Sequence, residues 1–342
     1  MSEEAIFGEM LPIAQAAHNS GGITIAQVSR LLDEPAPPQQ VRVPGILVDR
    51  IVLADPADHP QTFAQTEFNA AYVTAASPTE APGAALLEPL PVGPRRIIAA
   101  RACDEIPQGA IANLGIGMPE GVARIAAERK WLDRFTLTVE SGPIGGIPAG
   151  GLSFGVSVHP QAIVDQPAQF DFYDGRGLDY AALGAAQVDG EGNVNVSKFA
   201  TRLAGVGGFV NITQTAKKLI FCGTFTAGGL EVAVRDGRLE ITSEGRTSKV
   251  VDSVALVSFS ALRLGILEIP LLALFFFGAL TGVVLVLPDH EIRLPGRLPG
   301  MGRRTVRCAR PGIEPEARLR RDYWSGPARR WGWVVAIFVL AT

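Results

Sequence analysis

The sequence predicts an α/β fold in which helices lie on both faces of a layered sheet, with an apolar helix added near the C-terminus. Three observations predict it. Short strand-like runs alternate with helical segments between residues 96 and 255, a pattern typical of layered α/β sheets. The chain has 342 residues, of which 47% are hydrophobic and only 19% charged, so it can bury a large core. An uncharged run of 19 residues follows in the last third of the chain.

The first 95 residues predict a region of mixed helix and strand. Residues 1–33 have helical character, and Asn-Ser-Gly-Gly at 19–22 is a plausible helix stop. Residues 24–32 predict a strand and a short helix, and residues 41–56 alternate and then run apolar, which predicts strand. Five prolines between residues 74 and 95 predict a linker that ends in a domain boundary near residue 95.

The middle region carries the alternating pattern. Apolar spacing predicts helices over residues 95–106 and 119–132. Strand character is found in five runs, at residues 110–117, 135–141, 162–166, 180–189 and 218–226. Residues 230–242 predict a hairpin that turns at Asp236-Gly237. We therefore expect three regions, at residues 1–95, 96–255 and 256–342.

The C-terminal region differs from the rest of the chain. Ile269 to Leu287 has no charge over 19 residues, close to the ~20 that span a bilayer. It predicts a transmembrane helix, with membrane contact through residues 264–287. A Pro- and Gly-rich tail with many arginines follows. A truncated, frameshifted or rearranged reading frame is the simplest explanation, because this region shares no pattern with what precedes it, and a membrane-anchored protein is the alternative.

Charge and cysteine content narrow the class of protein. The net charge of −3 gives no reason to expect a nucleic-acid partner. Cys103, Cys222 and Cys308 are far apart and odd in number, which indicates a reduced compartment rather than a disulfide framework. The acidic N-terminus lacks the pattern of a signal peptide. We expect a cytoplasmic protein, with membrane association through the apolar run as the alternative.

The sequence predicts no metal site. It holds no CxxC or HxxxH spacing, and its four histidines are scattered. Asp171, Asp174 and Asp179 lie close together, but without His or Cys beside them turn and capping roles are favoured over metal binding. Cys222 lies in the middle of a predicted strand, where it is expected to act as a small buried hydrophobe.

A first glycine-rich turn follows the strand predicted at 110–117. Asn113, Gly115 and Gly117 lie in "NLGIGMPEGV", which leads from this strand into a helix. Glycines there let backbone amides approach a ligand, and the start of a helix favours negative charge. A tight turn between strand and helix is the simpler interpretation, since one Gly motif is a weak signal.

A second segment, "TVESGPIGGIPAGG", places one carboxylate among glycines. Glu140 ends an apolar run, and Gly145 and Gly146 follow closely. A carboxylate can act as a general base, a nucleophile or an ion-pair partner. A nucleophile needs a carbonyl carbon within about 3.5 Å, and glycines would not block that approach. An ordinary Glu in a surface turn is the alternative.

Two further segments offer polar side chains and glycines. Gln187, Asn193 and Asn195 lie in a strand–turn–strand pattern, where they either position a ligand or satisfy backbone groups. Gly207 and Gly208 in "RLAGVGGFVNIT" again allow close backbone approach, with a left-handed turn as the alternative.

Taken together, these segments resemble a known family. They are similar, in order, to the class I coenzyme A transferases of the acetate/propionate and 3-oxoacid type. The resemblance covers most of residues 10–55 and 96–255. It rests on "NLGIGMPEGVA", "TVESGPIGGIPAGG", "DQPAQFDFYDGRGLD", "LGAAQVDGEGNVNVSKF", "RLAGVGGFVNITQ" and "FCGTFTAGGLEV".

The resemblance implies a CoA-transferase-like α/β fold and a mechanism. Glu140 matches the family's nucleophilic glutamate, which forms an acyl anhydride and then a glutamyl-CoA thioester in a ping-pong reaction. Gly207 and Gly208 match the loop against the thioester. Coenzyme A is then a substrate, and neither a metal nor a prosthetic group is required. Asn113, Gly115 and Gly117 match the glycine-rich turn at the mouth of the active site. Gly145, Gly146, Gln187 and Asn193 are further candidate residues for CoA binding.

The resemblance also implies substrates and partners. An acyl-CoA and a short-chain carboxylate are the expected substrates. Only the end of the family's N-terminal half has a counterpart here, so a homo-oligomer or a partner chain that supplies this half is expected. Three alternatives stay open at this point: an inactive remnant of the enzyme, a membrane-associated ligand-binding protein, and an acyl-CoA hydrolase in which water accepts the acyl group.

Overall fold

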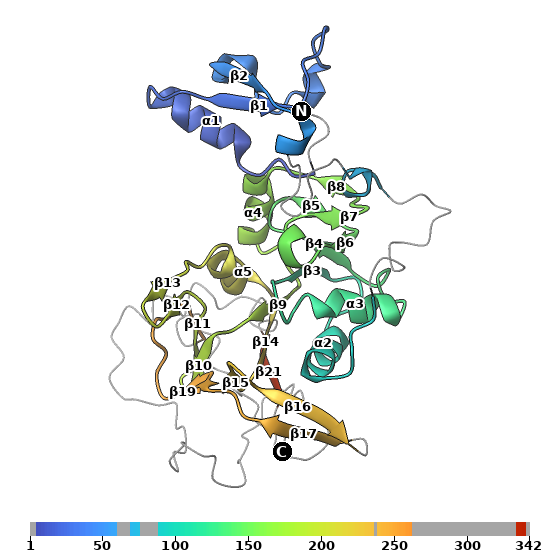
Figure 1. Cartoon of the computed structure of the whole chain (residues 1–342), viewed down its shortest axis with the longest axis vertical. Helices are drawn as coiled ribbons and strands as arrows, with labels where there is room; N and C mark the ends of the chain where they lie inside the picture. Colours follow the sequence, from blue (N-terminus) through green and yellow to red (C-terminus); the bar gives the residue numbers. More distant parts are fainter. Residues whose placement is uncertain (1–4, 60–68, 76–87, 236–237, 262–332, 340–342) are drawn as a thin grey trace, which may run out of the picture.

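The computed structural model shows a mixed α/β sheet with flanking helices and smaller sheets at its ends (Figure 1). The structure describes residues 5–59, 69–75, 88–235, 238–261 and 333–339. The predicted apolar helix at 264–287, the arginine-rich tail and the turn at Asp236-Gly237 lie outside these residues. No helix among the described residues reaches the length and apolar character needed to cross a bilayer.

The central sheet has seven strands in the order β21-β14-β9-β3-β4-β5-β8. Strands β21, β14, β9, β3 and β4 run parallel, whereas β5 and β8 pair antiparallel, so the sheet is mixed. The strands span β3 Ile111–Leu114, β4 Thr136–Thr138, β5 Pro143–Ile144, β8 Ala162–Ile163, β9 Tyr180–Gly184, β14 Lys218–Thr224 and β21 Trp333–Val339. β21 joins the sheet although it lies in the C-terminal region of the sequence.

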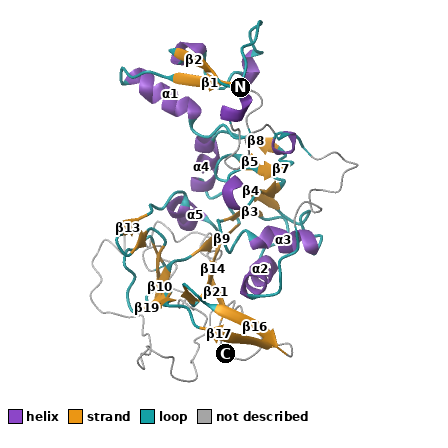
Figure 2. Cartoon of the chain, viewed as in Figure 1, coloured by secondary structure: helices purple, strands orange, loops and turns teal. Residues whose placement is uncertain are grey.

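Helices cover both faces of this sheet, as the sequence predicts (Figure 2). They are α2 Pro94–Asp104, α3 Gly121–Glu128, α4 Gln166–Asp174 and α5 Phe209–Thr215. The α2 and α3 helices pack with Tyr180 and Ile220 of the sheet in one core cluster. The α4 and α5 helices pack with Leu183 and Phe221 in another. Because side chains alternate along a strand, β9 and β14 each supply both cores.

A second, smaller sheet packs beside α5. It has the order β19-β10-β11-β20, with Val188, Val194 and Phe259 in the same core cluster as α5. Its strands are β10 Gln187–Asp189, β11 Asn193–Asn195, β19 Val250–Val251 and β20 Phe259–Ser260. Three two-stranded pairs follow in the same half of the chain: β12 Lys198–Phe199 with β13 Arg202–Leu203, β15 Thr226–Ala227 with β18 Thr247–Ser248, and β16 Glu231–Arg235 with β17 Arg238–Ser243. A fourth pair, β6 Ile147–Pro148 with β7 Ser157–Val158, lies beside β4.

The N-terminal residues form a separate group of short elements at the top of Figure 1. They comprise α1 Met10–Asn19 and a parallel pair of strands, β1 Ile25–Val28 and β2 Arg50–Leu53. This group meets the rest of the chain through backbone hydrogen bonds. Gln166 N–H donates to Gly8 O, and His159 N–H donates to Ala71 O. Tyr72 and Val156 are both buried in the small core at this junction.

Several predicted elements have the expected position. The helix ends at Asn19, α2 begins one residue before the range 95–106 predicted for it, α3 lies within 119–132, and the strands of the middle region are all present. The hairpin predicted over 230–242 is the pair β16–β17. These segments share strong apolar periodicity or a clear stop signal, which is why local sequence predicts them.

Other predictions differ from the structure. The short helix expected within 24–32 is absent, since residues 29–32 are irregular after β1. The strand expected over 41–56 is confined to Arg50–Leu53, because Pro44 leads into a 3-10 turn at Gly45–Leu47. The helices α4 and α5 were not predicted, although Asp165 and Pro167 form a recognisable start for α4.

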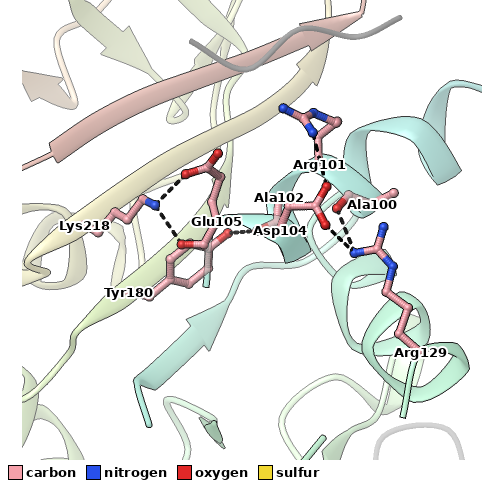
Figure 3. A network of polar contacts seen from close by, with 8 residues as sticks. All are labelled: Ala100, Arg101, Ala102, Asp104, Glu105, Arg129, Tyr180 and Lys218. Atoms are coloured by element: carbon pink, nitrogen blue, oxygen red, sulfur yellow. Dashed lines mark hydrogen bonds and ion pairs between the residues drawn. The ribbon is translucent and has the colours of Figure 1, made fainter. Parts of the chain in front are cut away.

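A set of ion pairs ties α2 to its neighbours (Figure 3). Lys218 Nζ at the start of β14 lies 2.5 Å from Glu105 Oε2 and 2.7 Å from Glu105 O, just beyond the end of α2. The hydroxyl of Tyr180 donates to Ala102 O at 2.7 Å. Arg129 Nη1 lies 2.6 Å from Asp104 Oδ1. These contacts fix α2 against the central sheet on the face formed by the first core cluster.

Candidate active site

Glu140 lies just beyond the end of β4, at the edge where the parallel strands of the sheet end. Its carboxylate accepts a hydrogen bond from the backbone N–H of Gly208 at the start of α5. Burial raises the pKa of the Glu140 carboxyl, and the Gly208 hydrogen bond offsets part of that rise. The desolvated carboxylate of Glu140 therefore lies between the end of β4 and the start of α5.

The absence of a side chain at Gly208 lets Glu140 and Phe170 approach its backbone closely. A Cβ added there would overlap the Glu140 Oε2 atom and lie 2.6 Å from the Phe170 Cζ atom. Real Cβ atoms essentially never approach neighbours so closely, so any other residue at this position would displace the Glu140 carboxylate or the Phe170 ring. The contact joins the glycine segment around Glu140 to the one around Gly208.

The glycines that follow Glu140 serve the turn itself. Gly142, Gly145 and Gly146 have positive φ angles of 123°, 76° and 69°, a region that L side chains rarely adopt. A Cβ at Gly145 would lie 2.7 Å from Gln161 Cγ, and one at Gly146 would collide with the Val158 carbonyl oxygen. These glycines therefore let the chain reverse tightly against neighbouring strands, and their Cβ positions face protein atoms.

The first glycine-rich turn is divided between core and surface. Asn113 is buried in β3, and its Nδ2 lies 3.3 Å from Thr138 O and 3.4 Å from Tyr173 Oη. Gly115 is buried against β9, where its N–H donates to Ala182 O at 2.8 Å. Gly117 is exposed with a φ of 87°, and its carbonyl accepts a hydrogen bond from Arg95.

The polar residues of the strand–turn–strand segment bond within the second sheet. Gln187 Oε1 accepts hydrogen bonds from Asn195 Nδ2 at 2.8 Å and from Ala255 N–H at 2.9 Å. Asn193 Nδ2 donates to Asp189 Oδ2 at 3.1 Å. Two of these contacts join side chains and one satisfies a backbone N–H, and a role of Gln187 and Asn193 in binding a ligand stays a prediction.

The structure brings together Glu140 and Gly208 of the predicted set, and adds residues that sequence reasoning missed. Phe170 lies against Gly208, and its ring meets the Tyr173 ring edge-on with centroids 5.6 Å apart. Both aromatics come from α4, which was not predicted. The signal was present in "DQPAQFDFY", where a helix start is followed by Phe170 and Tyr173 at a spacing of three.

The aspartate cluster has structural partners. Asp174 accepts hydrogen bonds from Asn211 Nδ2 at 3.0 and 3.1 Å. Asp179 accepts from Ile111 N–H at 2.9 Å and pairs with Lys217 at 2.7 Å. Within the described ranges no three His, Cys, Asp or Glu side chains gather in a way that could hold a metal ion.

Cys222 is buried in the middle of β14, as predicted, and burial raises the pKa of its thiol to about 12. A thiol with so high a pKa is almost fully protonated near neutral pH, and the thiolate is the nucleophilic form. Glu140 therefore remains the candidate nucleophile of this part of the chain.

Comparison with known proteins gives close relatives. No family model matches the chain. The chain is 42% identical over 262 residues to acetate CoA-transferase YdiF of Escherichia coli K12, covering 75% of this chain and 48% of that protein. It is 42% identical over 270 residues to caffeate CoA-transferase of Acetobacterium woodii, covering 75% and 49%.

A solved structure supports the same relationship. The YdiF acyl-CoA transferase of E. coli O157:H7, solved as a thioester complex with CoA, is 40% identical, with a TM-score of 0.67. The match covers 78% of this chain and 49% of that one. The chain thus spans about half the length of the relatives it matches. On sequence and fold together, the chain belongs to the class I coenzyme A transferase family.

Proposed function

We propose that the chain transfers coenzyme A from an acyl-CoA to a short-chain carboxylate, with Glu140 as the nucleophile. One observation carries this proposal: a desolvated carboxylate held against the Gly208 N–H, in the space that a side chain at Gly208 would take. The relatives named acetate and caffeate CoA-transferase support the reaction class. An acetate- or propionate-type acceptor is the proposed substrate class.

The first step forms a mixed anhydride. A Glu140 oxygen attacks the thioester carbonyl carbon, the carbon–sulfur bond breaks, and CoA leaves as its thiolate. Burial raises the pKa of Glu140, so its carboxylate is more basic, and hence more nucleophilic, than one in water. The Gly208 N–H already donates to the Glu140 carboxylate, so it is a preformed donor for the negative charge that develops on a glutamyl oxygen in the following step, when the CoA thiolate attacks the glutamyl carbonyl.

The next steps transfer CoA to the protein and then away from it. The CoA thiolate attacks the glutamyl carbonyl of the anhydride, the anhydride carbon–oxygen bond breaks, and the acyl group leaves as a carboxylate. The product on the protein is a glutamyl-CoA thioester. A second carboxylate then reverses both steps and leaves as a new acyl-CoA, with Glu140 restored. Binding energy from the long CoA chain can stabilise the anhydride relative to the starting thioester.

Two of the glycines predicted to bind CoA have an exposed backbone that the CoA molecule could contact. Gly117 and Gly207 are exposed, have positive φ angles of 87° and 55°, and have nothing within 4 Å of the position of a Cβ. We infer that they line the approach of CoA. For five other residues, contact with CoA stays a prediction, because their hydrogen bonds or the space beside their Cα atoms involve other protein atoms: Gly115, Gly145, Gly146, Gln187 and Asn193.

A second half of the enzyme is part of the proposal. The relatives are about twice as long as their match to this chain. A partner chain, or another copy in a homo-oligomer, would supply the CoA contacts of that half. Coenzyme A enters the reaction as a substrate and leaves as a product.

Trapping the thioester tests the proposal. After incubation with acetyl-CoA, hydroxylamine or borohydride should modify Glu140, and peptide mass spectrometry should locate the modification. Glu140→Gln should show none, while Glu191→Gln, an exposed carboxylate in the β10–β11 turn, should behave as wild type. An unmodified Glu140 in the wild-type chain would contradict the proposal. Formation of the thioester releases one acetate per chain, so release of many equivalents of acetate without a second carboxylate would instead indicate a hydrolase.

A further inference from the structure

Beside Glu140 lies a buried polar cluster that the steps above do not use. It consists of Asn113 of β3, Thr138 of β4, and Gln169 and Tyr173 of α4. Their exposed fractions are 1%, 2%, 1% and 0%. Four polar side chains buried between a sheet and a helix are costly unless they are paired, so their arrangement calls for a reason.

The Tyr173 hydroxyl is the centre of the cluster. It donates to Thr138 Oγ1 at 2.9 Å and accepts from Asn113 Nδ2 at 3.4 Å. Thr138 Oγ1 in turn donates to Ala112 O at 3.1 Å. The proton of the tyrosine is therefore committed to Thr138, and the ring is anchored to two neighbouring strands.

The cluster is not fully satisfied. Among the described residues, neither Nε2 nor Oε1 of Gln169, nor Oδ1 of Asn113, has a hydrogen-bond partner within 3.5 Å. Gln169 nonetheless lies near enough to the Tyr173 hydroxyl to lower its pKa. Unpaired buried polar atoms reduce stability. Such a local conflict with good packing is expected where function, and not folding, selects the residues.

The cluster reaches Glu140 along two routes. Thr138 lies two residues before Glu140 on the same chain segment. Phe170 packs edge-on against Tyr173 and also fills the space beside Gly208, where the Glu140 carboxylate lies. The charge of Glu140 also contributes to raising the pKa of the Tyr173 hydroxyl, after the larger effect of burial.

We propose that Tyr173 is a positioning residue for Glu140. Anchored by its hydrogen bonds with Thr138 and Asn113, and with Gln169 near its hydroxyl, it holds the Phe170 ring in place. The ring excludes water from the Glu140 carboxylate and keeps that carboxylate against the Gly208 N–H. This inference rests on the proposed function for its catalytic meaning, but the arrangement has a consequence that can be measured without catalysis.

Titration of Glu140 tests the proposal directly. In protein with 13C-labelled glutamate, the carboxyl signal missing from Glu140→Gln identifies Glu140. Tyr173→Phe should move its midpoint down toward the ordinary value of 4.5, because water enters. The other titratable groups on the helices packed here, Asp171 and Asp174 of α4, are exposed, and α5 carries none.

Tyr180→Phe is the matched control. Tyr180 is equally buried, and its hydroxyl donates to the backbone carbonyl of Ala102 (Figure 3). It belongs to the first core cluster, on the face of the sheet opposite to the cluster that holds Tyr173. It should leave the Glu140 midpoint unchanged. In the transfer assay Tyr173→Phe should lower kcat by roughly 10- to 100-fold, as for a small misplacement of a reacting group, with KM unchanged, and Tyr180→Phe should not.

Gln169→Leu separates positioning from folding. It removes two unpaired polar atoms, so the melting temperature should rise by about 2–4 °C while the Glu140 midpoint still falls. An unchanged midpoint in both Tyr173→Phe and Gln169→Leu overturns the proposal. If the wild type forms no Glu140 thioester but the midpoint falls in both variants, the proposed function fails and the positioning role stands.

Discussion

At the scale of single residues, Glu140 and Gly208 show how far the sequence reaches. Sequence patterns single out both positions, but in separate segments and for separate reasons. That they touch depends on the packing of α5 against the end of β4, which no local spacing contains. The same limit applies to Asn113, whose side chain is buried in the polar cluster and does not face an open turn.

Replacing Gly208 by Ala should disable the site. The added Cβ overlaps the Glu140 carboxylate and crowds the Phe170 ring, so the carboxylate must leave the backbone N–H. Thioester formation at Glu140, followed by mass spectrometry, should fall about 100- to 1,000-fold, as when an oxyanion donor is lost. Gly190→Ala is the control, because nothing lies within 4 Å of its Cβ position. Similar rates for both variants would show that the close approach is unimportant.

Glu140→Gln should stabilise the fold near neutral pH. Below the ordinary pKa of 4.5 both states of the wild type are protonated, and the carboxyl adds no pH dependence. Above it the unfolded state ionises first, since burial raises the folded-state pKa. The stability of the wild type relative to the variant therefore falls with rising pH until the raised pKa is passed, and is constant beyond it.

Urea unfolding of both proteins between about pH 2 and pH 8 measures this difference. Glu128→Gln is a control of opposite sign, because the hydrogen bond from Arg96 lowers the pKa of Glu128. There the wild type should be the more stable at neutral pH, and the advantage should be lost as pH falls through the lowered pKa. A Glu140→Gln variant less stable than wild type at neutral pH would contradict the burial of this carboxylate.

At the scale of elements, the spacing of apolar residues predicts the helices α2 and α3 but not α4 and α5. The spacing in α2 and α3 reveals them, because one face of each lies in the first core cluster. The α4 segment, QPAQFDFYD, holds two aspartates and is followed directly by a glycine-rich turn. The α5 helix has only seven residues, with β-branched Val210, Ile212 and Thr213 among them. Tertiary packing against the sheet, rather than intrinsic preference, makes these two helices.

The ion pair between Lys218 and Glu105 should matter for stability. Their side chains are only 16% and 13% exposed, so removing one partner leaves the other as a largely buried charge without its ion-pair partner. Lys218→Met should reduce the free energy of unfolding by about 3 kcal/mol, and Lys218→Met with Glu105→Leu should regain most of it. Denaturant unfolding of the single and the double variant measures both changes in the free energy of unfolding.

The exposed pair Arg235–Glu240 is the control for this prediction. Its atoms lie 3.7 Å apart, and the side chains are 69% and 48% exposed. Arg235→Gln should change the free energy of unfolding by less than about 1 kcal/mol. An equal loss in both pairs would mean that burial of the Lys218 pair has no energetic effect.

At the scale of the whole molecule, the α/β class and the family follow from the order of the motifs. The alternation of strand and helix predicts a layered sheet, and it is found, with β9 and β14 packed on both faces. The mixed character of the sheet could not be predicted, because the antiparallel β5 and β8 have two residues each. The role of residues 264–287 stays a prediction, since they lie outside the described residues.

The separation of Glu140 and Gly208 along the chain has a consequence during synthesis. Glu140 leaves the ribosome well before Gly208, with α4 and β9 still to be made between them. Until α5 docks, the carboxylate is solvated and has the reactivity of any glutamate in water. In the nascent protein, Glu140 is therefore expected to be unreactive toward cellular thioesters. The proposed acylation of Glu140 then requires the completed fold.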